Sequence, residues 1–383
     1  MRPTPLLATG ALMGAFMGAF MGAPVAASPS LAATQTAYSD CGADDLDRRI
    51  AGCTLIIDAR GETERNRGTA YVRRGQAWRQ KGDLNHAIAD FTSAIGLGPA
   101  YSSAYALRGS AWYAKGELDH AISDYDQAIR SNPNSAFAHH MRGLAMIDKQ
   151  DLDRAFADFT DAIRINPKDI QAYDDRGLIL LRRGESDRAI DDFTTAIGID
   201  PSPTFDLDGR RIDLYVDRGS VLSNKGEFDR AIADFDQAVS LDPKDVAAYS
   251  NRGLAWLGKS DNDRAIADFS EAIRLAPTFT VNYYRRGIVR YDNYMHAAAL
   301  VDANDLVQAI ADFGEVIRLE PNDADAYYAR GVAYETNGDR EHAIADLTQA
   351  VDLRPDNEKM LAALKQLKPD FNPNDLKGFL ERH

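Results

Sequence analysis

Several features that would indicate an enzyme or a nucleic-acid-binding protein are missing from this sequence. It has no phosphate-binding loop, no G-x-S-x-G elbow, no H-E-x-x-H motif and no C-x-x-C pair. The seven histidines are scattered, so we expect neither a metal site nor a cofactor. Basic residues number 44 against 58 acidic ones, and the net charge of −14 disfavours nucleic acid as a partner. The sequence therefore predicts a protein that is not an enzyme.

Long hydrophobic runs are also scarce, and the only clear one lies at the start of the chain. Residues 6–21 are uncharged, and Pro-Val-Ala-Ala ends at Ala27. This pattern is typical of a secretory signal that is cleaved after a small residue, here Ala27 or, as second choice, Ala33. The alternative is a retained membrane anchor, because small residues share one helical face at Gly10, Gly14, Gly18 and Gly22. We expect an exported protein, periplasmic or secreted, with no membrane contact unless this segment is retained.

Cysteine occurs only twice, at Cys41 and Cys53, between the apolar segment and the repeats described below. An even number of cysteines in an exported chain suggests one disulfide. Two unrelated thiols are the alternative. A metal site is disfavoured because no histidine lies nearby.

The chain is instead rich in one repeated stretch, which occurs eight times. An Arg-Gly pair opens the pattern, and its glycines are spaced by 34, 34, 34, 42, 34, 34 and 44 residues, at Gly75, Gly109, Gly143, Gly177, Gly219, Gly253, Gly287 and Gly331. A proline closes each copy, at Pro99, Pro133, Pro167, Pro201, Pro243, Pro277, Pro321 and Pro355.

A 34-residue unit with glycine, alanine, an aromatic residue, alanine and proline at fixed offsets resembles the tetratricopeptide repeat. The chain is therefore similar to exported bacterial proteins of that family. The resemblance implies an all-α fold, a right-handed superhelical solenoid of helix-turn-helix repeats. A solenoid grows by stacking units, so we expect one continuous array.

The repeat spacing also predicts how the chain is divided. The expected segments are a signal peptide at 1–27, an N-terminal cap with a half repeat and the Cys41–Cys53 disulfide at 28–66, repeats one to four at 67–201, an inserted connection at 202–211, repeats five to eight at 212–355, and a C-terminal cap helix with a tail at 356–383. A hinge at 202–211 is the alternative to a bulged connection. Repeat seven is extended by an insertion near 291–305, which favours longer helices. Residues 33–39 are small and polar, and we expect them to be disordered.

Within each repeat the glycine costs roughly 1 kcal/mol in a helix, so its recurrence needs a packing reason. We expect Gly75 to face Ala87 where the two helices cross, and Phe91 to fill the remaining space. Arginine precedes every glycine and aspartate precedes every aromatic position. We favour an ion pair within each repeat over an arginine ladder that binds an anionic ligand.

The resemblance implies a groove, lined by the first helices, that binds a peptide or an extended protein segment. Carried over by position, the groove residues are Arg73, Gln76, Leu107, Tyr113, His140, Leu144, Asp174, Arg182, Asp217, Asn251, Tyr284, Arg285 and Tyr328. The family's clamp for a C-terminal carboxylate is not supported, because its lysines are absent. We expect a scaffold for protein or peptide partners. A cell-envelope assembly factor and a ligand sensor are the alternatives.

Overall fold

The computed structural model describes residues 33–98, 101, 103–200, 213–296 and 303–371. The chain forms two compact units, Met1–Asn132 and Pro133–His383, which we describe separately. Their boundary follows the second full repeat, a division that the repeat spacing did not predict. The expected signal at 1–27, the connection at 202–211 and the C-terminal tail lie outside the described residues. Within the described ranges all regular structure is helical, which confirms the predicted all-α fold.

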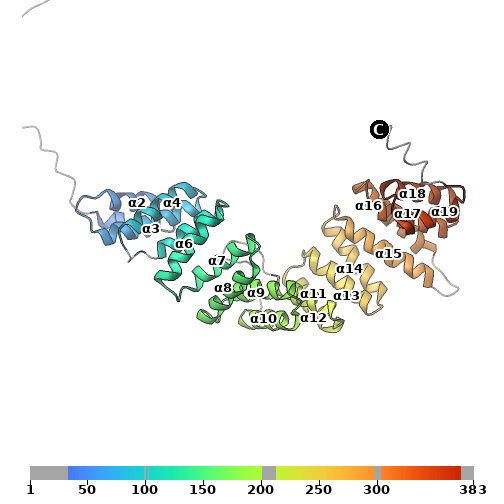
Figure 1. Cartoon of the computed structure of the whole chain (residues 1–383), viewed down its shortest axis with the longest axis horizontal. Coiled ribbons are helices and arrows are strands. Elements are labelled where there is room, and N and C mark those ends of the chain that lie inside the picture. The colour runs from blue at the N-terminus through green and yellow to red at the C-terminus, as the bar shows by residue number, and fades with distance from the viewer. Residues whose placement is uncertain (1–32, 99–100, 102, 201–212, 297–302, 372–383) are drawn as a thin grey trace, which may run out of the picture. The chain divides into compact units, whose positions relative to one another are not determined.

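Unit 1 holds an N-terminal helical pair and the first two full repeats (Figure 1). Its helices are α1 (Gln35–Cys41), α2 (Leu46–Asp58), α3 (Glu64–Gln80), α4 (Leu84–Gly96), α5 (Ser103–Ala114) and α6 (Leu118–Ser131). The two helices of each repeat pack on each other, and α4 packs on α5 of the next repeat.

Unit 2 holds the remaining repeats and a C-terminal helix. Its helices are α7 (Ala136–Asp148), α8 (Leu152–Ile165), α9 (Ile170–Arg182), α10 (Ser186–Ile199), α11 (Leu214–Asn224), α12 (Phe228–Leu241), α13 (Val246–Gly258), α14 (Asn262–Leu275), α15 (Thr280–His296), α16 (Ala303–Leu319), α17 (Ala324–Thr336), α18 (Arg340–Leu353) and α19 (Glu358–Leu367). As in unit 1, the two helices of each repeat pack on each other, and the second helix packs on the first helix of the next repeat.

The recurring glycine makes room for an aromatic ring inside its own repeat. A Cβ atom added to Gly75 would lie 2.8 Å from a ring carbon of Phe91, and one added to Gly253 would lie 2.7 Å from Phe269. The ring is thus the group nearest to the glycine, and in repeats two and eight the carbonyl oxygen of the alanine equivalent to Ala87 also lies close, 3.2 Å from a Cβ atom on Gly109 and 3.3 Å from one on Gly331. Phe91 and Phe269 are fully buried, and burial of such a side chain contributes roughly 2 to 3 kcal/mol.

The recurring arginine and aspartate form the predicted ion pair. Arg74 donates from Nε and Nη2 to the two carboxylate oxygens of Asp90, at 2.9 and 2.7 Å. Its Nη1 donates to Thr54 on α2, at 2.8 Å, so one guanidinium joins three helices. The same pair recurs at Arg108–Asp124, Arg142–Asp158, Arg176–Asp192, Arg218–Asp234, Arg252–Asp268, Arg286–Asp312 and Arg330–Asp346. These arginines are paired with aspartates inside the repeats, so they do not form an arginine ladder that binds an anionic ligand.

The turn between the two helices of a repeat uses the left-handed backbone conformation. Gly82 has φ of 80° and Gly184 has φ of 76°, a conformation that glycine adopts without steric cost. Gln150 and Ser260 adopt the same conformation, with φ of 62° and 60°, in repeats that lack the glycine. The turn therefore has the same backbone conformation even where the residue carries a side chain.

The N-terminal cap is a helical pair, so the expected disorder of residues 33–39 was wrong over most of that segment. Thr34 caps α1, and the Tyr38 hydroxyl donates to Glu62 at 2.6 Å. A disulfide joins Cys41 at the end of α1 to Cys53 on α2. A Cβ atom on Gly52 would lie 2.5 Å from the Cys41 nitrogen, so this glycine permits the close approach of α1. The predicted half repeat is therefore completed by a short helix.

Two other features at the C-terminal side follow the sequence prediction. Helices α15 and α16 have 17 residues each, against 13 in α13, so repeat seven is longer. Helix α19 covers the last repeat, with Met360, Leu364 and Leu367 packed among buried residues of α18. This helix closes the open end of the core of unit 2.

Candidate functional site

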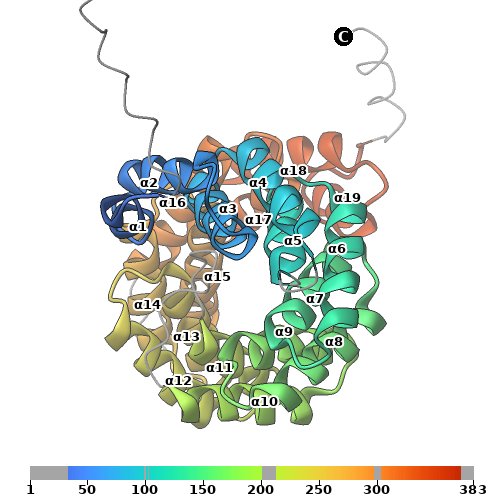
Figure 2. The ribbon, with the colours of Figure 1, turned by 90° about the vertical axis from the view of Figure 1, so that its left-hand side faces the viewer.

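The inner face of unit 2 is formed by the first helices of its repeats. Figure 2 shows α9, α11, α13 and α15 on the inner side of the curved stack, with α10, α12 and α14 outside. The residue before the repeated arginine has the same register on each inner helix, and we call this set the inner row: Asp175, Asp217, Asn251 and Arg285. Its members extend across successive repeats.

Hydrogen bonds connect neighbouring inner helices through the inner row. Asn251 donates from Nδ2 to the Ser220 hydroxyl on α11, at 3.4 Å. Arg285 donates from Nη1 to the Ser250 hydroxyl on α13, at 2.6 Å. Ser250 in turn donates to Oδ1 of Asn282, at 2.6 Å. Helices α11, α13 and α15 are therefore direct neighbours, and the inner row lies where they meet.

Arg285 differs from the other arginines of its helix. Arg286 and Arg290 both reach Asp312, at 2.6 and 2.7 Å. Within the described ranges Arg285 has no carboxylate within ion-pair distance, and burial alone lowers its pKa. A half-buried guanidinium without a counter-ion is costly, because its desolvation is not offset. Most of its five N–H donors remain available for an acceptor.

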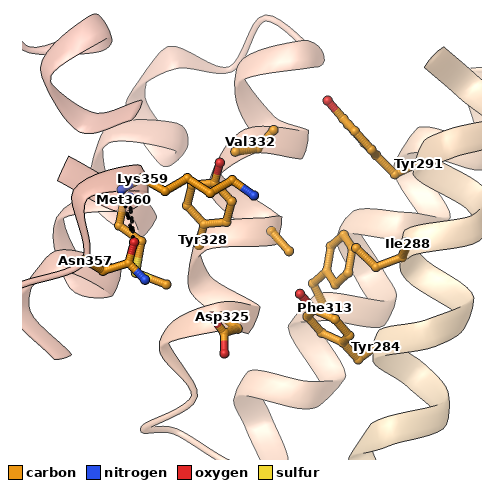
Figure 3. Close-up of a pocket in the computed structure, with 11 residues that line it drawn as sticks. Tyr284, Ile288, Tyr291, Phe313, Asp325, Tyr328, Val332, Asn357, Lys359 and Met360 are labelled. Atoms are coloured by element: carbon orange, nitrogen blue, oxygen red, sulfur yellow. Dashed lines mark hydrogen bonds between the residues drawn. The ribbon is translucent and has the colours of Figure 1, made fainter. Parts of the chain in front are cut away.

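A cavity of about 310 Å³ opens between α15, α17 and α19. Figure 3 shows Tyr284 and Ile288 of α15 on one side and Tyr328 of α17 and Met360 of α19 on the other. The Tyr284 and Phe313 rings pack with centroids 5.7 Å apart. Aromatic walls with few polar groups suit an apolar side chain of a ligand.

Two charged groups border this cavity. Asp325 is paired with Arg354 at 2.8 Å. Lys359 has its ammonium 5.0 Å from the centre of the Tyr328 ring, a cation–π contact. Arg285 does not line the cavity, because its guanidinium contacts Ser250 on α13, in the preceding repeat.

Asp217 is a half-buried carboxylate further along the inner row, on α11. Burial, together with the charge of Asp213, raises the pKa of Asp217 to about 6. Across the described part of the chain no cation forms an ion pair with it. The inner row thus has an acidic group on α11, an amide on α13 and a basic group on α15.

The structure brings together some of the residues expected in the groove. Tyr284 and Tyr328 line one cavity, and Asn251 and Arg285 belong to the hydrogen-bonded inner row. The other expected residues of unit 2 are on neighbouring inner helices, with Asp174 half-buried, Arg182 exposed and Leu144 buried. The expected residues of unit 1 lie on α3 and α5, namely Arg73, Gln76, Leu107 and Tyr113, and are not part of this cluster.

His140 is buried rather than groove-lining. Its ring nitrogens lie 3.6 Å from Asp169 and 3.2 Å from Asp175. Burial by itself lowers its pKa, but hydrogen bonds to the two carboxylates outweigh burial and raise the pKa to about 9. His140 is therefore a charged structural group that joins α7 to α9.

Sequence reasoning missed several residues of the site, including Ser250, Ile288 and Lys359. A signal for Ile288 was present on α15, where apolar residues recur every seven positions on one helical face, at Val281, Ile288 and Met295. These three side chains are exposed by 42%, 42% and 53%, so the core of the repeat does not use them.

Metal chemistry and membrane insertion find no support in the described ranges. No group of three or more histidine, cysteine, aspartate or glutamate side chains there is arranged to hold a metal ion. Nor does any described helix combine the length and apolar character that crossing a bilayer requires.

Comparison with known proteins agrees with the architecture. Tetratricopeptide repeat models match residues 72–136, 140–202, 216–278 and 324–357, and a TPR repeat model matches 297–338, together more than half of the chain. The comparison with curated protein sequences gives no match.

Solved structures of repeat proteins are similar in fold. The C-terminal part of a TPR protein from Cytophaga hutchinsonii has a TM-score of 0.54 and 19% identity over 67% of this chain and 98% of that one. A tetratricopeptide repeat protein from Parabacteroides merdae gives 0.48 and 19%, over 70% and 98%. YrrB, described as a TPR protein with an unusual peptide-binding site, gives 0.43 and 25%, over 54% and 97%. The chain belongs to the tetratricopeptide repeat family, whose repeats serve as scaffolds for protein–protein interaction.

Proposed function

We propose that this protein is a non-enzymatic scaffold that binds a peptide or an extended protein segment on the inner face of unit 2. The observation that carries the proposal is the aromatic cavity between α15, α17 and α19. A concave apolar cavity with a few polar groups at its edge is the usual form of a binding site. An apolar side chain of the ligand would enter the cavity.

The exposed face of α15 supports the same location. Ile288 lines the cavity although 42% of its surface is exposed, and Val281 and Met295 continue the apolar stripe along the helix. Apolar side chains left exposed in a row indicate a contact surface. A peptide that covered them would bury area that the repeat core leaves open.

An exported location is part of the proposal. The disulfide between Cys41 and Cys53 fits an oxidising compartment such as the periplasm or the extracellular space. The partner would then be a protein or a peptide segment of the same compartment. Neither nucleic acid nor a membrane surface suits a chain with a net charge of −14.

Selection from a pool of random linear dodecapeptides, displayed on phage, tests the proposal on the full chain. We expect enriched peptides with an aromatic or large aliphatic anchor. Their affinity for Ile288→Glu should be at least about tenfold weaker, because a charge would enter the apolar cavity. The matched control is Leu241→Glu, which changes a residue exposed by 49% on the outer helix α12. Equal affinity for both variants, or no enrichment at all, would contradict the proposal.

A further inference from the structure

We infer the charge pattern of the bound segment, and this inference rests on the proposed function. The segment carries a basic side chain over Asp217 and an acidic side chain over Arg285. Its apolar anchor lies beyond the acidic residue, in the cavity between α15, α17 and α19. The inference comes from the two charges of the inner row that have no described partner of opposite sign.

Arg285 selects a carboxylate because of how it is held. The Ser250 hydroxyl fixes Nη1 at 2.6 Å, and Ser250 is itself fixed by Asn282, which is 1% exposed. The guanidinium is therefore oriented before a ligand binds, with its other N–H groups unused by described acceptors. A planar guanidinium binds a carboxylate through two parallel hydrogen bonds, which a neutral ligand cannot match.

Asp217 selects a cation because its carboxylate has no described cation beside it. It has the same register on α11 that Arg285 has on α15, so it lies on the same inner row. Its carboxylate is half-buried, and among the described residues the charge that acts on it is that of another carboxylate, Asp213. A lysine or arginine of the ligand would relieve this repulsion and supply the missing counter-ion.

The spacing of the two charges follows from helix packing. Asp217 and Arg285 are two helix contacts apart, from α11 to α13 and from α13 to α15. Packed helices lie about 8 to 10 Å apart, so the two charges are separated by roughly 16 to 20 Å. An extended peptide advances about 3.3 Å per residue, so its basic and acidic residues should be about five or six positions apart. Asn251, between them, is neutral and can bond to the peptide backbone.

The test is a set of parallel selections from the dodecapeptide pool on the full chain. Wild type should enrich peptides with a basic and an acidic residue about five or six positions apart, and the apolar anchor beyond the acidic one. Asp217→Arg should invert the preference at the basic position only, and Arg285→Glu at the acidic position only. Asp263→Arg and Arg318→Glu, on the outer helices α14 and α16, are the matched controls and should keep the wild-type pattern.

Affinities of synthetic peptides complete the test and protect it against a variant that folds poorly. On wild type, reversing either peptide charge should weaken binding at least about tenfold, and the reversed peptide should regain affinity on the matching variant. Enriched peptides that depend on Ile288 but show no charge pattern would overturn this inference and leave the proposed function standing. No enriched peptide on any chain would overturn both.

Discussion

Arg252 on α13 donates two hydrogen bonds to the carboxylate of Asp268 on α14, at 2.9 and 2.6 Å, and the Asp268 side chain is 8% exposed. The same guanidinium donates to Asp236 of the preceding repeat, at 2.7 Å. Every full repeat contains this charge pair, and in several of them, such as those of Arg108 and Arg286, the arginine also bonds to a side chain of the preceding repeat. The pair uses the arginine side chain for structure, so this arginine is not available to a ligand.

Charge reversal at this pair should destabilise unit 2. Arg252→Glu leaves Asp268 buried beside a like charge, and loss of one partner of such a pair costs on the order of 3 to 5 kcal/mol. We expect a lower Tm and a lower urea midpoint, measured by circular dichroism. Arg274→Glu is the control, because Arg274 pairs only with Glu271 on an exposed surface and should change stability by less than about 1 kcal/mol. Equal effects of the two substitutions would refute the structural role of Arg252.

The glycine beside each buried ring should not accept a methyl group. Gly253→Ala would place Cβ 2.7 Å from a ring carbon of Phe269, and overpacking of this kind costs about 1 to 3 kcal/mol. Gly96→Ala is the control, because no atom lies within 4 Å of its added Cβ and alanine favours helix. Urea unfolding should show a loss for the first variant and none for the second. A stabilised Gly253→Ala would show that the ring has room to move.

His140 should make stability depend on pH. Its pKa in the folded chain is about 9, against 6.5 for the free side chain, so its contribution is complete below pH 6.5 and is lost as pH rises towards 9. The stability difference between wild type and His140→Gln should therefore shrink over that range, by about 3 kcal/mol at most. Urea titrations at pH 6 and pH 9.5 measure it. A difference that does not change with pH would mean that His140 is uncharged in the folded chain.

The disulfide should stabilise the N-terminal cap. Cys41 and Cys53 are 12 residues apart, and a loop of this size contributes about 2 to 3 kcal/mol when closed. A reductant should lower the unfolding midpoint of the oxidised protein and expose α1 to amide hydrogen exchange. The doubly substituted Cys41→Ser, Cys53→Ser chain is the control and should not respond to the reductant. Unchanged protection of α1 after reduction would assign its docking to Tyr38 and Glu62 alone.

Much of the fold was predictable because each repeat carries its own signals. The caps at Asp169 and Asp245, the glycine turn at Gly184 and the Arg74–Asp90 pair all depend on residues close in sequence. The close approach of the Phe91 ring to Gly75 was not predicted, because helical periodicity does not tell which residue of the second helix comes nearest to the glycine.

The candidate site was only partly predictable because it joins residues from different repeats. Register on the first helix placed Tyr284, Arg285 and Tyr328 in the groove, but it did not indicate that Lys359 and Met360 of α19 complete the cavity. Nor could it show that Arg285 lacks a carboxylate while Arg286 and Arg290 share Asp312, since that depends on packing between α15 and α16. Likewise, the sequence did not show that α1 forms at Gln35–Cys41 or that it packs closely against Gly52 of α2.

Photo-crosslinking tests the binding site most directly. An enriched peptide would carry benzoylphenylalanine in place of its apolar anchor, and mass spectrometry would locate the attached residue on the full chain after irradiation. We predict attachment to cavity residues of α15, α17 or α19, such as Ile288, Val332 or Met360, and loss of attachment when unlabelled peptide competes. Attachment to unit 1, or to the outer helices α12 and α14, would contradict the assignment of the inner face of unit 2 as the binding surface.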